Sequence, residues 1–236
     1  MQKTFKLIRN GDIDAVRDIL DKNPNEIYAV AKQPPKKDDG QSLLQVALKS
    51  GNYDIANLLL DYNSDVNFME SEDCCNEWRM PALHDAIRCA IMSSRWNSRI
   101  YGTDDFEVHS TKENADKAYE LLKRMLASGA DILAKDSAGN TALERAILDA
   151  RQLLPIYIYS SNTVSDNRKI TDELRGDFIR IFSLLYEYGA SSQWLDRHSG
   201  KTLAEQYAAE PVSEFINLQT TKAEKKLLFD RLFKKN

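Results

Sequence analysis

The chain has 236 residues, of which 42% are hydrophobic and 29% charged, so it can bury a substantial core. Its 32 Lys and Arg residues against 36 Asp and Glu residues give a net charge of −4, which argues against a nucleic-acid binder with a strongly basic surface. The longest nearly unbroken apolar run, residues 153–159, contains Pro155 and is far shorter than the roughly 18 residues of a membrane-spanning helix, so we expect no membrane partner.

The first residues lack the apolar stretch of a secretory signal peptide, and the three cysteines cannot form a closed set of disulfides. We therefore expect a cytoplasmic protein. Nine Gly and six Pro residues in this length favour helices joined by brief turns over a sheet of many strands. The expected fold class is all-α.

Three apolar segments end in the same way, with two bulky residues, two spacers and then Asn63, Gly129 or Gly189. Asn and Gly readily take the left-handed conformation that closes a helix, so these three residues are predicted helix C-caps, with Asn23 as a fourth candidate. Each such helix is preceded by a second apolar one that starts with a Leu-x-x-Ala pattern, at residues 42–47, 80–86 and 141–146.

With these features the chain resembles the ankyrin repeat family, whose unit of about 33 residues has a Thr-Pro-Leu-His-x-Ala box opening the first of two antiparallel helices. Residues 39–67 are similar to one nearly complete unit, residues 136–143 to a turn plus box, and residues 10–16 and 200–204 to weaker parts. Of the box histidines only His84 matches, and Gln45 and Glu144 stand at the equivalent positions. Degenerate first and last units are expected, because they cap the array.

The resemblance implies an ankyrin-repeat solenoid of antiparallel helix pairs forming a single domain. Its approximate repeats are residues 1–38, 39–79, 80–136, 137–196 and 197–218, followed by a C-terminal helix at 219–236. That last segment alternates Lys and Arg with Leu and Phe at helical spacing, so it is predicted to be an amphipathic capping helix. The alternative for this helix is binding to a membrane surface or to a partner.

The third and fourth repeats carry an insertion of the same length, because Ala86, Ile87 and Gly129 recur at one constant offset as Ala146, Ile147 and Gly189. We expect each insertion to prolong the first helix, through Trp96 to Ile100 or through Leu153 to Tyr159, and to form an elongated helical hairpin with a polar tip. Thr111 and Thr171 are predicted N-caps of the second helices. Pro155 should kink the second hairpin or stop its first helix early.

The family resemblance implies protein recognition through turn tips and exposed positions of the first helices, without catalysis. Matching positions select Val46, Asp85 and Arg145 on the helices and residues near Gly40 and Gly139 at the tips.

A second candidate surface is the nonrepeat stretch 68–79. Residues 38–90 contain ten acidic and three basic residues, and four of the acids, Glu70, Glu72, Asp73 and Glu77, lie in this stretch beside Trp78. The charge would steer a basic partner and Trp78 would anchor it. The alternative is that the acids only solvate a loop and Trp78 packs onto the next repeat.

Arg95 and Trp96 combine residue types that are enriched at interface cores, although Trp96 follows Ile91 and Met92 at helical spacing and that pattern favours packing.

Catalytic chemistry has little support in this sequence. His84 resembles the family's structural histidine, which ties one turn to a neighbouring repeat. Cys74, Cys75, Cys89 and His84 lack the spacing of structural zinc motifs, and no phosphate-binding loop or nucleophile elbow occurs. We therefore expect no metal, no cofactor and no enzymatic activity.

The leading hypothesis is a noncatalytic protein-interaction module, or scaffold, that binds a basic protein partner through its concave face and acidic loop. The alternative hypothesis is an inhibitor or immunity protein that neutralises a basic enzyme such as a nuclease toxin. The sequence leaves the oligomeric state open.

Overall fold

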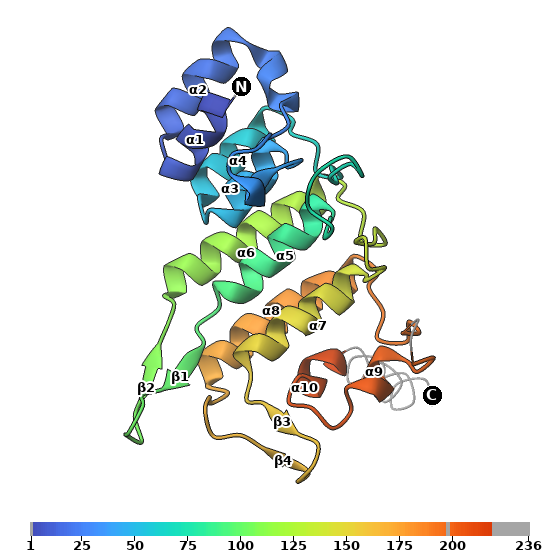
Figure 1. Ribbon diagram of the computed structural model, residues 1–236. Helices are drawn as coiled ribbons and strands as arrows, with labels where there is room; N and C mark the ends of the chain where they lie inside the picture. The colour runs from blue at the N-terminus through green and yellow to red at the C-terminus, as the bar shows by residue number, and fades with distance from the viewer. Residues whose placement is uncertain (1, 197–198, 219–236) are drawn as a thin grey trace, which may run out of the picture.

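The structure is a computed structural model that describes residues 2–196 and 199–218 (Figure 1). Within these residues, helices follow one another in antiparallel pairs. The pairs are α1 (Gln2–Asn10) with α2 (Ile13–Lys22), α3 (Leu43–Lys49) with α4 (Tyr53–Asp61), α5 (Ala82–Met92) with α6 (Lys112–Ala127), α7 (Ala142–Leu153) with α8 (Asp172–Glu187), and the short α9 (Leu203–Gln206) with α10 (Ser213–Ile216). Two 3₁₀ turns, η1 (Pro24–Tyr28) and η2 (Lys36–Asp38), precede α3.

The pairs stack on one another in two layers. The first helices form one layer, in which α1 contacts α3, α3 contacts α5 and α5 contacts α7. The second helices form the other layer, in which α2 contacts α4, α4 contacts α6 and α6 contacts α8. Each pair therefore buries its apolar faces against the next pair along the stack, as Figure 1 shows.

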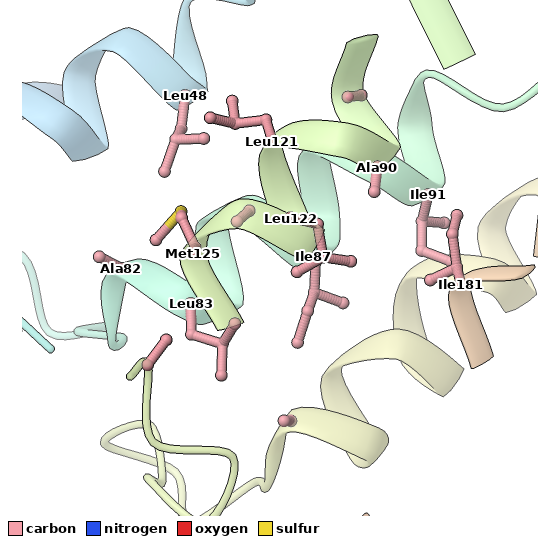
Figure 2. Packing of buried hydrophobic residues seen from close by; sticks show 14 of the residues in the cluster. Leu48, Ala82, Leu83, Ile87, Ala90, Ile91, Leu121, Leu122, Met125 and Ile181 are labelled. Atoms are coloured by element: carbon pink, nitrogen blue, oxygen red, sulfur yellow. The ribbon is translucent and has the colours of Figure 1, made fainter. Parts of the chain in front are cut away.

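The core runs without interruption between these layers. Figure 2 shows Leu83 and Ile87 of α5 packed near Leu122 and Met125 of α6. Ile181 of α8 lies toward the opposite end of α5 from Leu83. All five side chains are at most 1% exposed. Since α5 lies against α3, α6 and α7, it is the central helix of the stack.

Side chains at the helix ends explain where most helices begin and stop. Ser42, Thr141 and Thr202 each form a capping box with the Gln or Glu three residues later, and the predicted N-caps Thr111 and Thr171 accept the backbone N–H of Asn114 and Leu174. At the other end, Asn63, Gly129 and Gly189 have positive φ angles, which confirms their prediction as left-handed closing residues. The fourth candidate, Asn23, is the C-cap of α2 and its N–H donates to the Ile19 carbonyl, but its φ of −142° shows that it ends the helix without a left-handed conformation.

The insertions differ from the expected elongated helical hairpins, so the mostly helical fold also contains a few short strands. The first insertion forms the antiparallel hairpin β1 (Asn97–Arg99) and β2 (Phe106–Val108), and the second forms β3 (Tyr157–Ile158) and β4 (Thr163–Val164). The register pairs Ser98 with Glu107 and Tyr157 with Val164.

Local chemistry explains why the helices stop before the hairpins. The α5 helix ends at Met92, where the Ser94 hydroxyl donates to the Ala90 carbonyl and competes with the helical pattern. The α7 helix ends at Leu153, two residues before Pro155, as the early stop predicted. Trp96, Ile100 and Tyr159 therefore lie outside the helices that were expected to contain them.

The predicted C-terminal helix at 219–236 lies outside the described residues. Among the helices that the structure does describe, none is both long enough and apolar enough to cross a membrane.

Candidate protein-binding surface

The turns between successive helix pairs lie along one side of the stack, on the right in Figure 1. We call this side the turn edge and define it as residues 70–81, 131–141, 191–196 and 199–202. Single β-bridges, Met69 to Pro81 and Leu195 to Thr202, close two of these turns. Hydrogen bonds from Ser137 N–H to the Arg79 carbonyl, 2.9 Å, and from Arg79 N–H to Ser137 Oγ, 3.1 Å, join the first turn to the second.

The acidic stretch folds back over the loop that precedes α3. Asp39 Oδ2 accepts the Cys75 N–H at 2.9 Å, and the Asn76 amide donates to the Asp39 carbonyl at 2.9 Å. The hydrogen bond from Cys75 lowers the pKa of Asp39 below its ordinary value. A Cβ on Gly40 would lie 2.5 Å from Cys74 Cβ, so only glycine lets the two segments approach this closely. These contacts give the loop a defined path.

Four of the predicted residues are displayed by this loop. Glu72, Asp73 and Glu77 are exposed, and Trp78 keeps 49% of its surface exposed. The nearest compensating base is Arg79, whose Nη2 lies 3.3 Å from Glu72 Oε1. The loop thus presents acidic charge around one accessible aromatic side chain.

Glu70 does not belong to that display, because it is only 4% exposed. Its Oε2 accepts the Met80 N–H at 2.9 Å and its Oε1 lies 3.9 Å from Lys49 Nζ. The expected exposure of Glu70 is therefore corrected: this carboxylate closes its own turn instead of facing solvent.

The three positions expected to be exposed on the first helices are also buried: Val46 is 1%, Asp85 2% and Arg145 5% exposed. Val46 belongs to the apolar core, and Asp85 contacts Gln45 of the neighbouring first helix α3. Arg145 pairs with Asp149 through two contacts of 2.9 and 3.0 Å. As they stand, these residues offer no surface to a partner.

Asp85 forms part of a polar contact between α3 and α5. Its Oδ2 accepts from the Gln45 amide at 3.1 Å, and its Oδ1 lies 3.7 Å from Lys49 Nζ. Burial raises the pKa of Asp85 to about 7. The contact holds adjacent helix pairs in register.

His84 has the structural position that the sequence predicted. Its Nε2 lies 3.2 Å from the Ala134 carbonyl in the following turn, and burial lowers its pKa to about 4. Gln45, at the equivalent position of the preceding pair, donates from Nε2 to the Met80 carbonyl at 3.0 Å. The two residues therefore make the same connection to the next turn.

Arg95 ties the first insertion to α8, and Trp96 contacts Arg168 of the second insertion. The Arg95 guanidinium makes two contacts of 2.9 Å with the carboxylate of Asp177 in α8. The Trp96 ring lies 4.1 Å, centroid to centroid, from His109, and the Arg168 guanidinium lies 4.7 Å from the Trp96 centroid. This geometry favours packing over direct recognition for both residues.

Sequence reasoning missed the apolar part of the turn edge. Leu133 is 60% and Leu195 68% exposed, and with Trp194 they line a groove of about 470 Å³ between the second and third turns. Lys135, Thr141 and Glu144 also line this groove. The sequence could have indicated this groove, because Leu133 and Leu195 lie in predicted turns, where an apolar side chain has no core to enter.

Within the described residues, no cluster of His, Cys, Asp and Glu side chains is arranged to hold a metal ion. Cys74, Cys75 and Cys89 are free thiols.

Comparison with known families identifies one ankyrin repeat at residues 39–68, the segment that contains α3 and α4. Ankyrin repeats are generally protein–protein interaction modules and are typically noncatalytic. No curated protein matches the chain.

Proposed function

We propose that this chain is a noncatalytic protein-interaction module of about five ankyrin-type units, and that its turn edge binds a partner carrying basic and apolar groups. The observation that carries the proposal is that three successive turns each display a large apolar side chain: Trp78 at 49%, Leu133 at 60% and Leu195 at 68% exposure. Single exposed apolar residues are ordinary, but a series along one edge is typical of an interaction site.

The acidic and the apolar residues of the turn edge would have different roles in recognition. Glu72, Asp73 and Glu77 would attract a basic partner from a distance and suppress acidic ones. Trp78 and the groove between Leu133 and Leu195 would supply the contacts from which most binding free energy comes, since interface energy concentrates in a few buried aromatic and aliphatic groups. The first helices contribute less than the family resemblance implied, because Val46, Asp85 and Arg145 are buried.

Affinity capture from the native cell, followed by measurement of the dissociation constant with the purified partner, tests this proposal. Trp78→Ala and Leu195→Ala are each expected to weaken binding at least about tenfold, the loss typical of an interface anchor. Reversing Glu72, Asp73 and Glu77 to Lys should slow association most strongly at low salt. The matched control is Glu113→Lys, an exposed acid on α6.

Unchanged affinity in both the Trp78→Ala and the Leu195→Ala proteins, with folding verified by circular dichroism, would place recognition elsewhere. If the captured partner is a basic enzyme, its activity in the complex separates the two hypotheses: an inhibitor abolishes turnover, whereas a scaffold leaves it unchanged.

A further inference from the structure

The two insertions, distant in sequence, are locked together at the opposite end of α5 from the acidic loop, at the lower end of Figure 1. The Arg99 N–H donates to the Asn167 carbonyl at 2.9 Å. The Asn97 amide and the Lys169 backbone exchange two further hydrogen bonds, each 2.9 Å. These contacts cover the outer edge of β1 with the segment that follows β4.

The outer edge of β2 has no such cover. The Ile100 N–H donates to Asp105 and the His109 N–H donates to Trp96, so the hydrogen-bonded positions alternate and the backbone groups of Phe106 and Val108 point away from β1. Within the described residues, no other segment makes a backbone hydrogen bond to Phe106 or Val108. This edge can accept another strand.

The side chains around the open edge are both apolar and acidic. Ile100 is 44%, Val108 60% and Tyr101 fully exposed. Asp105 and Glu107 are exposed and form no ion pair with any described residue, whereas Asp104 pairs with Arg99. The chemistry therefore fits an extended segment that alternates basic and apolar residues.

The hairpin is held in place before any partner arrives. Arg95 anchors its base to Asp177, and Lys169 Nζ lies 4.1 Å from the centroid of the Phe106 ring. A preorganised edge loses little conformational freedom on binding, which favours association through a short strand.

We propose that the outer edge of β2 is a second binding site, which takes up an extended basic and apolar segment of a partner protein by strand addition. Backbone hydrogen bonds to Phe106 and Val108 would give affinity, and Glu107 and Asp105 would select positive charge. A second copy of this chain is disfavoured, because antiparallel pairing of two β2 strands about their centres would place Glu107 opposite Glu107. The site is separate from the turn edge and does not depend on its proposed role.

The test uses the full chain and a fluorescein-labelled peptide of alternating Lys and Val, followed by fluorescence anisotropy at low salt. We expect saturable binding, and hydrogen exchange of the Phe106 and Val108 amides that slows on addition of peptide. Glu107→Lys should weaken binding at least about tenfold, a loss of about 1.4 kcal/mol. Glu187→Lys, the same charge change at the far end of α8, is the matched control and should bind as the wild type does.

Two further probes isolate the strand geometry and the surface. A peptide with every backbone nitrogen methylated and an alternating Glu and Val peptide should both fail to bind. Reversal of Glu72 and Asp73 to Lys should leave binding unchanged, so failure of this inference and failure of the proposed function are distinguishable.

Three results would overturn the proposal. They are equal binding of the methylated peptide, equal binding by the Glu107→Lys protein, and self-association in sedimentation that Glu107→Gln, which removes the like charges, strengthens and the peptide does not dissociate.

Discussion

His84 and Asp85 are neighbours on α5, and burial acts on their ionisation in opposite senses. Burial lowers the pKa of His84 from 6.5 to about 4, so between these values only the unfolded chain binds this proton and stability rises with pH. Burial raises the pKa of Asp85 from 3.8 to about 7; Glu70 adds to this increase, whereas Lys49 and Arg88 oppose it. Between these two values only the folded chain holds the proton, so stability falls as pH rises. The two contributions partly cancel in the wild type.

Single substitutions should separate the contributions of His84 and Asp85 to the pH dependence of stability. Relative to the wild type, the free energy of unfolding of His84→Gln should decrease as pH rises from about 4 to 6.5, and that of Asp85→Asn should increase as pH rises from about 4 to 7. Each slope can reach at most about 1.4 kcal/mol per pH unit, the value for one proton. Urea unfolding across this pH range measures both. Variants whose stability runs parallel to the wild type at every pH would contradict the assignment.

The choice of Gln for His84 has a precedent in the chain, because Gln45 already makes the equivalent bond to the next turn. The role of His84 could be predicted, since it depends on a local pattern. The burial of Asp85 and Arg145 could not, because it arises from partners on other helices or from the approach of a neighbouring pair. From sequence alone, a charged residue in an amphipathic helix is expected to face solvent.

At the scale of secondary-structure elements, some features of the insertions could be predicted from the sequence and others could not. The constant offset between them and their N-caps Thr111 and Thr171 follow from residues close in sequence. The two hairpins could not be predicted this way. Their strands have only two or three residues, and β1 is supported by Asn167 and Lys169 of the other insertion.

The N-cap of α8 depends only on residues close in sequence, and it can be tested directly. Thr171 Oγ1 accepts the Leu174 N–H at 3.2 Å, so Thr171→Ala should lower the free energy of unfolding by about 1 kcal/mol. Thr171→Ser retains the acceptor and should recover most of that loss. Chemical denaturation of the three proteins measures the difference; an equal loss in both variants would show that the hydroxyl is not the cause.

The contact of Arg95 with Asp177, which anchors the first insertion to α8, depends on residues distant in sequence. Asp177 is 1% exposed and receives the Arg95 backbone N–H as well as its guanidinium, so Asp177→Ala leaves partly buried donors without an acceptor. We expect a loss of about 2 kcal/mol or more and faster amide exchange at Ile100 and His109. The control is Asp172→Ala on the same helix, an exposed acid whose removal should change stability little. Unaltered exchange at the hairpin in the Asp177→Ala protein would show that Arg95 does not hold it.

On the scale of the whole molecule, α5 separates two candidate binding surfaces. The first segment of the turn edge, residues 70–81, leads into the start of α5, and the open strand edge of β2 lies beyond the end of α5. The stacking of helix pairs could be predicted from the repeated pattern of residues 42–47, 80–86 and 141–146. The positions of Leu133 and Leu195 on facing walls of one groove could not, because that depends on how successive turns approach each other.

The same arrangement predicts that the stack does not unfold evenly. The helices α5 to α8 are longer than α1 and α2, and they surround the central Ile87. The interlocked insertions also join these helices to one another. By contrast, α1 and α2 have neighbours on one side only. In a stack with nearest-neighbour contacts, local stability follows such differences. Native-state hydrogen exchange in low urea should therefore give smaller opening free energies for α1 and α2 than for α5 to α8.

A substitution at the centre of the stack sharpens this test. Ile87 is fully buried among the side chains of Figure 2, so Ile87→Ala should lower the opening free energy of α5 to α8 by about 2–5 kcal/mol. The amides of α1 and α2 should keep their wild-type values, because these helices open without breaking the contacts of Ile87. If every helix instead exchanged at one common free energy, and Ile87→Ala shifted all of them equally, the molecule would unfold as a single cooperative unit. The interlocked insertions would then add no separate stability.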